Sequence, residues 1–137
     1  MSERAPAPSG LKVLVVGGDP ILRGGVAQYL RLTLSSVTVE EASSALEGLL
    51  IFGAAAWDLI VLDLAAKRGL EPLIQLKLAI PDVPVLVLNV DPTPESIQAA
   101  RTAGAAGYLS KGSPAPEWRT AVETVARRGT YPDVASA

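Results

Sequence analysis

Three polar residues in this sequence follow short apolar runs, and their side chains are the ones that could do chemistry. Asp63 ends LIVLD, Asn89 ends VPVLVLN, and Lys111 follows GYLS. A carboxylate at the tip of an apolar strand costs free energy unless water or a cation is near it. Lysine supplies a compact positive charge that suits a carboxylate or a phosphate. The residues predict either an Asp63–Lys111 ion pair at a sheet edge or a site that handles phosphate, and spacing alone leaves both open.

The residue types that are absent exclude many kinds of site. The sequence has no cysteine and no histidine. This rules out disulfides, thiolate nucleophiles, cysteine-held metals, Ser-His-Asp catalysis and histidine as a phosphate carrier. Twelve basic and fourteen acidic residues give a net charge of −2, which argues against nucleic-acid binding by this chain itself. Glycine-rich nucleotide-binding motifs are also missing. An enzyme would have to use Asp63, Lys111 and a hydroxyl such as Ser110.

The chain length and apolar content predict one domain with a substantial core. The sequence has 137 residues, of which 49% are hydrophobic, as expected for a single globular domain. Residues 1–10, MSERAPAPSG, have little to bury and are predicted to be a flexible leader. They lack the apolar segment of a signal peptide. No apolar run approaches the roughly 20 residues of a membrane span. A cytoplasmic protein without a membrane partner is therefore predicted.

Strand-like and helix-like segments alternate along the chain. The predicted strands are Leu11–Val16, Val37–Glu41, Leu59–Leu64, Val83–Asn89 and Gly107–Ser110. The predicted helices run from Pro20 to about Leu34, Ser44 to about Ala56, Leu70 to Ala79, Pro94 to about Ala103, and Ser113 to about Arg128. Strands that are almost wholly apolar are typical of parallel sheets covered on both faces. This pattern predicts a doubly wound α/β fold with a five-stranded parallel sheet and five helices. Its working site is expected at the carboxyl ends of the strands.

Capping residues mark where several of these helices begin. Asp19 before Pro20, and Thr93 before Pro94, combine an N-cap side chain with proline at the first helical position. Ser44 and Glu47 fit a capping box, in which each side chain accepts a hydrogen bond from the backbone N–H of the other residue.

In this order and spacing, four segments resemble the receiver domain of bacterial two-component response regulators, and most of all those of LuxR-type transcription factors. They are DLIVLDL at Asp58–Leu64, VPVLVLN at Val83–Asn89, AGAAGYLSKGSP at Ala103–Pro114 and RGGVAQYL at Arg23–Leu30. The resemblance covers residues 11–129 and implies the flavodoxin-like receiver fold. It also implies that residues 130–137 begin a linker to a helix-turn-helix output domain. The protein would contact DNA only through that output domain.

The resemblance assigns roles to several positions. Asp63 falls on the aspartate that accepts a phosphoryl group from a partner histidine kinase, and Lys111 falls on the lysine that contacts the phosphate. Asn89 stands where the family has Ser or Thr on the phosphate, and its amide can donate a hydrogen bond in their place. Tyr108 matches the aromatic residue whose rotation reports phosphorylation. Ala65 falls where a backbone carbonyl helps to hold Mg²⁺.

The main departure from the family is at the end of the first strand. Gly17 and Gly18 replace the acidic pair that helps to hold Mg²⁺, which favours carboxylate-rich octahedral sites. Asp19 is the adjacent acid that could bind the ion with Asp63, or it could simply cap the following helix. Lys67 and Arg68 bring positive charge that could partly substitute for a metal. We therefore predict a pseudo-receiver that ordinary Mg²⁺-dependent phosphorylation does not switch.

Two other functions stay open from the sequence. In the first, Asp63 is phosphorylated with Mg²⁺ held by Asp63, Asp19 and the Ala65 carbonyl. In the second, the chain is a small α/β nucleotide-binding protein or enzyme. For partners, the resemblance implies a homodimer through the fourth and fifth helices, with Ile97–Arg101, Tyr108 and Trp118–Glu123 on that face. Trp118 either anchors this interface or covers the edge of the core.

Overall fold

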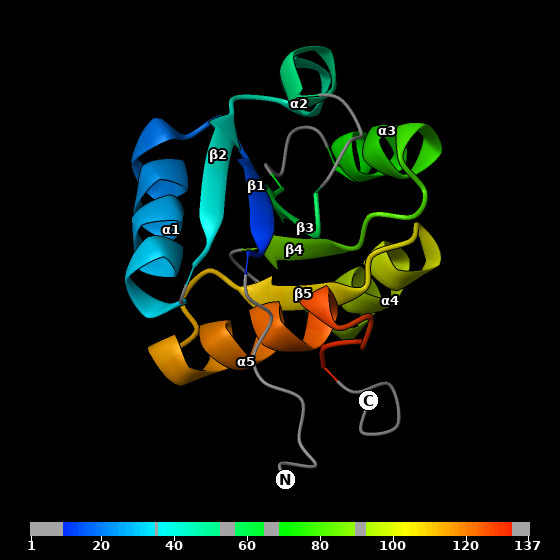
Figure 1. Cartoon of the computed structure of the whole chain (residues 1–137). Helices are drawn as coiled ribbons and strands as arrows, with labels where there is room; N and C mark the ends of the chain where they lie inside the picture. The colour runs from blue at the N-terminus through cyan, green and yellow to red at the C-terminus, as the bar shows by residue number, and fades with distance from the viewer. Residues whose placement is uncertain (1–9, 35, 53–56, 65–68, 90–92, 133–137) are drawn as a thin grey trace, which may run out of the picture.

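The computed structural model describes residues 10–34, 36–52, 57–64, 69–89 and 93–132, and these form one parallel sheet with helices on both faces (Figure 1). The strands are β1 (Lys12–Val16), β2 (Thr38–Ala42), β3 (Leu59–Asp63), β4 (Val85–Asn89) and β5 (Gly107–Ser110). The helices are α1 (Pro20–Thr33), α2 (Ala45–Phe52), α3 (Glu71–Ala79), α4 (Pro94–Thr102) and α5 (Ala115–Ala126). The predicted five-stranded doubly wound fold is confirmed.

The strand order β2-β1-β3-β4-β5 puts β3 at the centre of the sheet. All four neighbouring pairs are parallel, so the carboxyl ends of the strands lie along one edge. The register sets Asp63 beside Leu88 and Asn89 beside Ser110. This edge therefore collects the polar residues that follow β1, β3, β4 and β5, as expected of a parallel α/β sheet.

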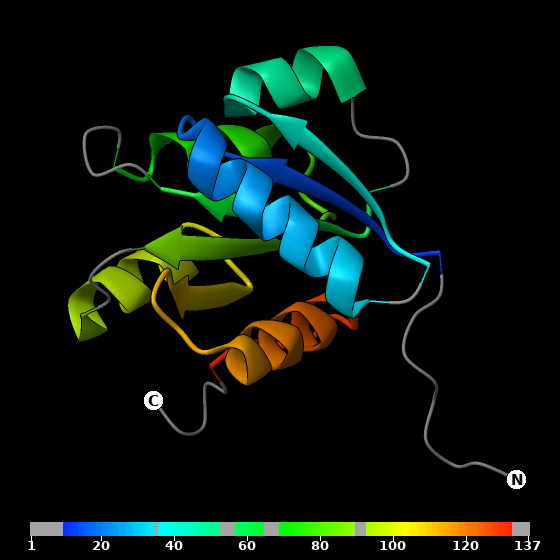
Figure 2. The same ribbon diagram turned by 90° about the vertical axis from the view of Figure 1, so that its left-hand side faces the viewer.

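Each face of the sheet has its own hydrophobic core. Helices α1 and α5 lie side by side over one face, as Figure 2 shows, and pack on residues such as Val13, Val61 and Leu88. Helices α2, α3 and α4 cover the other face, where the packing includes Ile60 and Leu62. Successive residues of a strand thus serve opposite cores, which explains why the sequence of β3 is apolar throughout.

The helix starts agree with two of the predicted caps. Asp19 Oδ1 accepts hydrogen bonds from the backbone N–H groups of Ile21 and Leu22, at 3.0 and 3.3 Å, and Pro20 begins α1. Thr93 caps α4, where the side chain of Ser96 completes a capping box. These side chains satisfy N–H groups that have no partner within the helix.

One half of a predicted capping box and one predicted helix start need correction. Ser44 Oγ accepts from the N–H of Glu47 at 3.0 Å, but Glu47 Oε1 accepts from the N–H of Ser43 at 2.5 Å, one residue earlier than a capping box requires. Helix α5 begins at Ala115 with Pro114 as its N-cap residue, and no side chain caps it. The predicted Ser113 start is two residues early because prolines at 114 and 116 set the start of the helix.

Some predictions concern parts of the chain outside the described residues. They are the leader up to residue 9, the end of the second helix at residues 53–56, and the linker from residue 133 onward. Within the described part of the chain, no helix has both the length and the apolar character needed to cross a membrane.

Candidate functional site

Asp63 lies at the tip of the central strand and forms an ion pair with Lys111. The Asp63 side chain is 8% exposed and that of Lys111 is 20% exposed. The N–H of Lys111 donates to the carbonyl of Asn89 at 2.8 Å, which ties the residue after β5 to the end of β4. Of the two alternatives that the residues left open, the ion pair is therefore present in the structure.

The two glycines after β1 have different surroundings. A Cβ atom added to Gly17 would lie 2.9 Å from Cβ of Asp63, which is closer than two such carbons normally approach. A Cβ atom added to Gly18 would have the carbonyl oxygen of Ser43 as its nearest neighbour, at 4.0 Å. Asp63 in its present position thus depends on glycine at position 17, whereas position 18 has room for a side chain.

Asp19 serves the helix rather than the pocket. Its carboxylate accepts the two hydrogen bonds that cap α1, and the residue is exposed. The capping alternative for Asp19 therefore agrees with the structure. Across the described residues, no group of three acidic, histidine or cysteine side chains is arranged to hold a metal ion. Ala65, Lys67 and Arg68 lie outside the described residues. The described side chains do not fit a carboxylate-rich Mg²⁺ site.

A pocket of about 270 Å³ opens beside Asp63. The residues that line it come from the ends of β1 and β3 and the starts of α2 and α3, and include Gly17, Gly18, Ser43, Ser44 and Gln75. Asp63 is the one carboxylate among these lining residues. The pocket therefore has both apolar and polar walls, and it carries little negative charge with which to attract a cation.

Arg23 on α1 supports this edge of the pocket, and the sequence analysis missed it. Its Nη1 atom donates to the carbonyl of Gly17 at 2.7 Å, and its Nε atom donates to Glu41 at 3.0 Å. The arginine thereby joins α1, β2 and the loop after β1. The sequence offers no signal for this contact, because Arg23 and Glu41 are 18 residues apart on different elements.

Glu47 lies at the start of α2, next to the serines of the pocket. Hydrogen bonds from the backbone and side chain of Ser43 hold the pKa of the Glu47 carboxyl below its usual value, and the charge of Arg23 adds to this effect. Partial desolvation acts in the opposite direction but is the smaller influence. The turn after β2 is thus fixed by an ionised glutamate.

Asn89 and Tyr108 form a second polar cluster further along the sheet edge. Asn89 Nδ2 donates to the Tyr108 hydroxyl at 2.7 Å, and that hydroxyl donates to Oγ of Ser96 at 3.0 Å. Tyr108 is 3% exposed and packs in the core on the α3 and α4 side. The aromatic side chain is therefore buried and held by hydrogen bonds to β4 and α4. Ser96 was predicted from the sequence only as part of a helix, and its contact with Tyr108 was not predicted.

Trp118 belongs to the core on the opposite face of the sheet. It is 8% exposed, and its indole Nε1 donates to the carbonyl of Ser113 at 3.1 Å. Its ring meets that of Tyr29 edge to face, with centroids 6.2 Å apart. Of the two predictions for Trp118, the structure supports the one in which it covers the edge of the core.

The fold and this edge define the class of the protein. The sheet has five parallel strands, and its central strand ends in a largely buried aspartate. A lysine that follows the next-but-one strand forms an ion pair with this aspartate. This combination is typical of a receiver-type signalling domain. The family model of the response regulator receiver domain matches residues 13–123. The chain therefore belongs to the response regulator receiver family.

Several known proteins are similar to this chain. The methanol utilization control regulatory protein MoxX of Paracoccus denitrificans is 33% identical over 127 residues, which is 90% of this chain and 56% of that protein. The nitrate/nitrite response regulator NarL of Escherichia coli is 33% identical over 113 residues, covering 81% of this chain and 50% of the relative. The chain thus spans about half the length of these curated relatives.

Solved structures agree with the family and the fold. A LuxR family DNA-binding response regulator from Silicibacter pomeroyi superposes with a TM-score of 0.78 and 28% identity, covering 88% of this chain and 94% of that one. The signal receiver domain of the putative response regulator NarL from Mycobacterium tuberculosis gives a TM-score of 0.74 and 29% identity, with 88% and 98% covered. The relatives of this chain are thus LuxR- and NarL-type regulators.

Proposed function

We propose that this chain is a response regulator receiver domain whose signalling state is set by protein contacts and not by Mg²⁺-dependent phosphorylation of Asp63. The observation that carries the proposal is the composition of the pocket, in which Asp63 is the one carboxylate among the lining residues. Transfer of a phosphoryl group to a carboxylate needs a cation to offset charge on the moving oxygens. Gly17 and Gly18 provide no side-chain ligand for that cation.

The neighbouring acid supports the same proposal. Asp19 would have to leave the N–H groups of Ile21 and Leu22 in order to turn toward a metal. Losing an N-cap costs about 1 kcal/mol. Lys111 already supplies one positive charge to Asp63. An incoming cation would have to share the Asp63 carboxylate with this lysine.

The buried aromatic residue also supports a state that does not depend on phosphate. The hydroxyl of Tyr108 is held between Asn89 and Ser96 in the unphosphorylated chain. If rotation of this ring reports the state of the domain, Asn89 keeps it turned inward without a phosphate. Asn89 has a longer side chain than the Ser or Thr that the family carries here, which lets it reach the tyrosine hydroxyl.

The second candidate function is a receiver that is phosphorylated on Asp63 by a histidine kinase. Family membership favours it, as does Lys111, which lies where it could neutralise a phosphoryl group on Asp63. Mg²⁺ would then bind Asp63, Asp19 and the Ala65 carbonyl. An enzymatic or nucleotide-binding function gains no support from the family match.

A Mg²⁺ titration followed by beryllium fluoride, observed by amide NMR, separates the two functions. We expect no saturable shifts at Asp63, Asn89 or Lys111 up to roughly 20 mM Mg²⁺. In Gly18→Asp, where the added side chain has room, saturable Mg²⁺ shifts should appear and should vanish when Asp63→Asn is added. Gly24→Asp, on α1, controls for the added charge. Saturable shifts in the unmodified chain that Asp63→Asn removes would establish the phosphorylated receiver instead.

The partners proposed for this domain follow its relatives. We propose that it is cytoplasmic and regulates a helix-turn-helix output domain; the Silicibacter pomeroyi relative, which is named a DNA-binding response regulator, supports an output that binds DNA. The net charge of −2 predicts that the chain alone does not bind DNA. Fluorescence anisotropy with a labelled duplex at low salt tests this, and tight binding by the chain alone would contradict it.

We further propose that the domain pairs through α4, β5 and α5. Tyr108 and Trp118 are buried, so the contacting side chains would be those of Ile97–Arg101 and of Arg119 on α5. Sedimentation velocity over a wide concentration range, with Arg119→Glu as the variant, tests this face. A concentration-dependent dimer that Arg119→Glu leaves unchanged would exclude it.

A further inference from the structure

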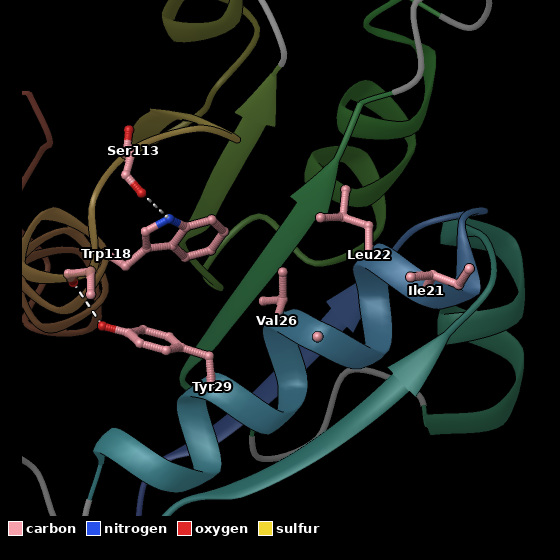
Figure 3. Close-up of a pocket in the computed structure, with 8 residues that line it drawn as sticks. Ile21, Leu22, Val26, Tyr29, Ser113 and Trp118 are labelled. Carbon is pink, nitrogen blue, oxygen red and sulfur yellow. Dashed lines mark hydrogen bonds between the residues drawn. The ribbon is translucent and has the colours of Figure 1, made fainter.

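We propose that the groove between α1 and α5 is a binding site for a small, uncharged aromatic molecule (Figure 3). The groove has a volume of about 450 Å³, within the range of pockets that bind small molecules. Its main walls are Ile21, Leu22, Gly25, Val26, Tyr29 and Trp118. It lies on the opposite face of the sheet from Tyr108, and the proposal holds whether or not Asp63 is phosphorylated.

One end of the groove is closed by a hydrogen bond between its two helices. The Tyr29 hydroxyl donates to the carbonyl of Ala115 at 2.7 Å, and the tyrosine therefore spans from α1 to α5. Its ring meets the indole of Trp118 edge to face, with an interplanar angle of 66°. The closed end thus consists of two fixed aromatic rings, which favour another ring beside them.

The polar atoms of the walls leave little for a polar ligand. The two aromatic side chains use their donors within the protein, Tyr29 on Ala115 and Trp118 on Ser113. No residue that lines the groove carries a charge. Any charged group brought into the groove would lose its hydration without gaining an ion pair. This favours an uncharged ligand that is held mainly by its apolar surface.

The closed end of the groove favours a small molecule over a docked helix. Its lining on α1 runs from Ile21 to Tyr29, and eight steps of an α-helix measure about 12 Å. The side chains by which a helix docks in a groove span about 11 Å and would fit this length, but the Tyr29–Ala115 hydrogen bond closes one end and leaves no room for the helix to continue. Ile21, which is 86% exposed, lies at the other end and adds apolar surface for a ligand to cover.

Gly25 keeps the groove open and provides the test. A Cβ atom added to Gly25 would meet nothing within 4 Å, and the same holds for Gly24. Both glycines lie in α1, but only Gly25 lines the groove. Leucine at position 25 should therefore fill the groove without displacing backbone, and leucine at position 24 is the matched control. Both changes replace glycine with a better helix former.

The experiment uses N-phenyl-1-naphthylamine, an uncharged aromatic probe whose emission rises in apolar surroundings. We expect saturable binding of one probe per chain, with a Kd on the order of 100 μM. In NMR spectra the indole N–H of Trp118 should shift during the titration, while that of Trp57 serves as an internal reference. Gly25→Leu should weaken binding at least tenfold, a loss of about 1.4 kcal/mol, and Gly24→Leu should leave it unchanged.

Three results would overturn the proposal. The first is non-saturable emission, and the second is equal binding by the Gly25→Leu and Gly24→Leu variants. The third is a concentration-dependent dimer, seen by sedimentation without probe, that Gly25→Leu abolishes, because the occupant would then be a second copy of the chain. Far-UV circular dichroism and a urea melt of each variant establish that lost binding does not reflect lost folding.

Discussion

The Asp63 pocket and the α1–α5 groove lie next to the same short segment of chain but differ in the charge of the side chains around them. Lys111 pairs with Asp63 on one side of this segment, and Ser113, two residues later, lies in the groove. The pocket is lined by serines, a glutamine and Asp63 as well as apolar residues, and Asp63 is paired with Lys111, whereas no charged side chain lines the groove. The position of the pocket follows from the topology of the sheet. The groove arises from the particular side chains of two helices.

This difference decides what can disturb each region. The pocket responds to changes in charge, because its largest interaction joins two ions that are mostly shielded from water. The groove responds to changes in shape, because its walls are held by close packing and by hydrogen bonds between neutral groups.

Truncating Trp118 should give the largest loss of stability. Trp118→Ala removes a buried indole, its contact with Tyr29 and its hydrogen bond to Ser113. We expect a loss of about 3 kcal/mol in the free energy of unfolding, measured by urea denaturation. Trp118→Phe keeps a ring in place and should lose roughly half as much. If the alanine variant lost less than about 1 kcal/mol, Trp118 would not be part of the packed core.

Removing the lysine from the pocket should cost less, because water reaches part of the ion pair. Lys111→Met leaves the Asp63 carboxylate, whose side chain is 8% exposed, without its cation. A fully buried pair would lose 3–5 kcal/mol, and the partial exposure of Lys111 lowers our expectation to about 2 kcal/mol. Lys111→Arg keeps the charge and should recover most of this loss. Equal stability of the unmodified chain and Lys111→Met in urea would show that the pair contributes nothing.

The contrast between the two regions also explains what the sequence could predict. The strands and helices were predicted to within a few residues, because apolar runs, caps and prolines are local signals. Asp63, Asn89 and Lys111 were expected at one edge because parallel strands end together there. Their convergence needed no knowledge of side-chain packing.

The remaining features depend on pairs of side chains that lie far apart in the sequence. Tyr29 and Ala115 are 86 residues apart, so no local sequence pattern predicts the hydrogen bond that closes the groove. Arg23 contacts Gly17 and Glu41 only because the fold places α1 next to β2 and the end of β1. Glu47 accepts from Ser43 and not from Ser44, which depends on how the chain turns after β2. Periodicity and capping rules do not specify such contacts.

The same substitution should have opposite effects in the two regions. Gly17→Ala places a methyl group 2.9 Å from Cβ of Asp63 and should destabilise the chain by about 1 kcal/mol or more. Gly25→Ala adds a methyl group to open space within α1 and should stabilise it by about 0.5–1 kcal/mol. Urea denaturation of both variants gives the comparison. A stabilising Gly17→Ala would mean that Asp63 readily moves away from β1.

The smallest expected effect is a dependence on pH that only the pocket side should show. The folded chain holds the pKa of Glu47 below the usual 4.5, chiefly through hydrogen bonds from Ser43. A carboxyl group whose pKa is lowered by folding contributes stability above 4.5, and this contribution is lost as the pH falls through the folded value. Glu47→Gln should therefore lower the urea midpoint at pH 7, and the difference from the unmodified chain should shrink progressively as the pH falls below 4.5 toward pH 3.

The control for this experiment is Glu40→Gln, which removes an exposed carboxylate on β2. It tests the general effect of one less negative charge and should give a smaller difference between the two pH values. The groove variant Gly25→Ala should shift the midpoint equally at both pH values, because no acidic or basic residue lines the groove. A Glu47→Gln shift that is as large at pH 3 as at pH 7 would mean that the side chain acts through packing and not through its charge.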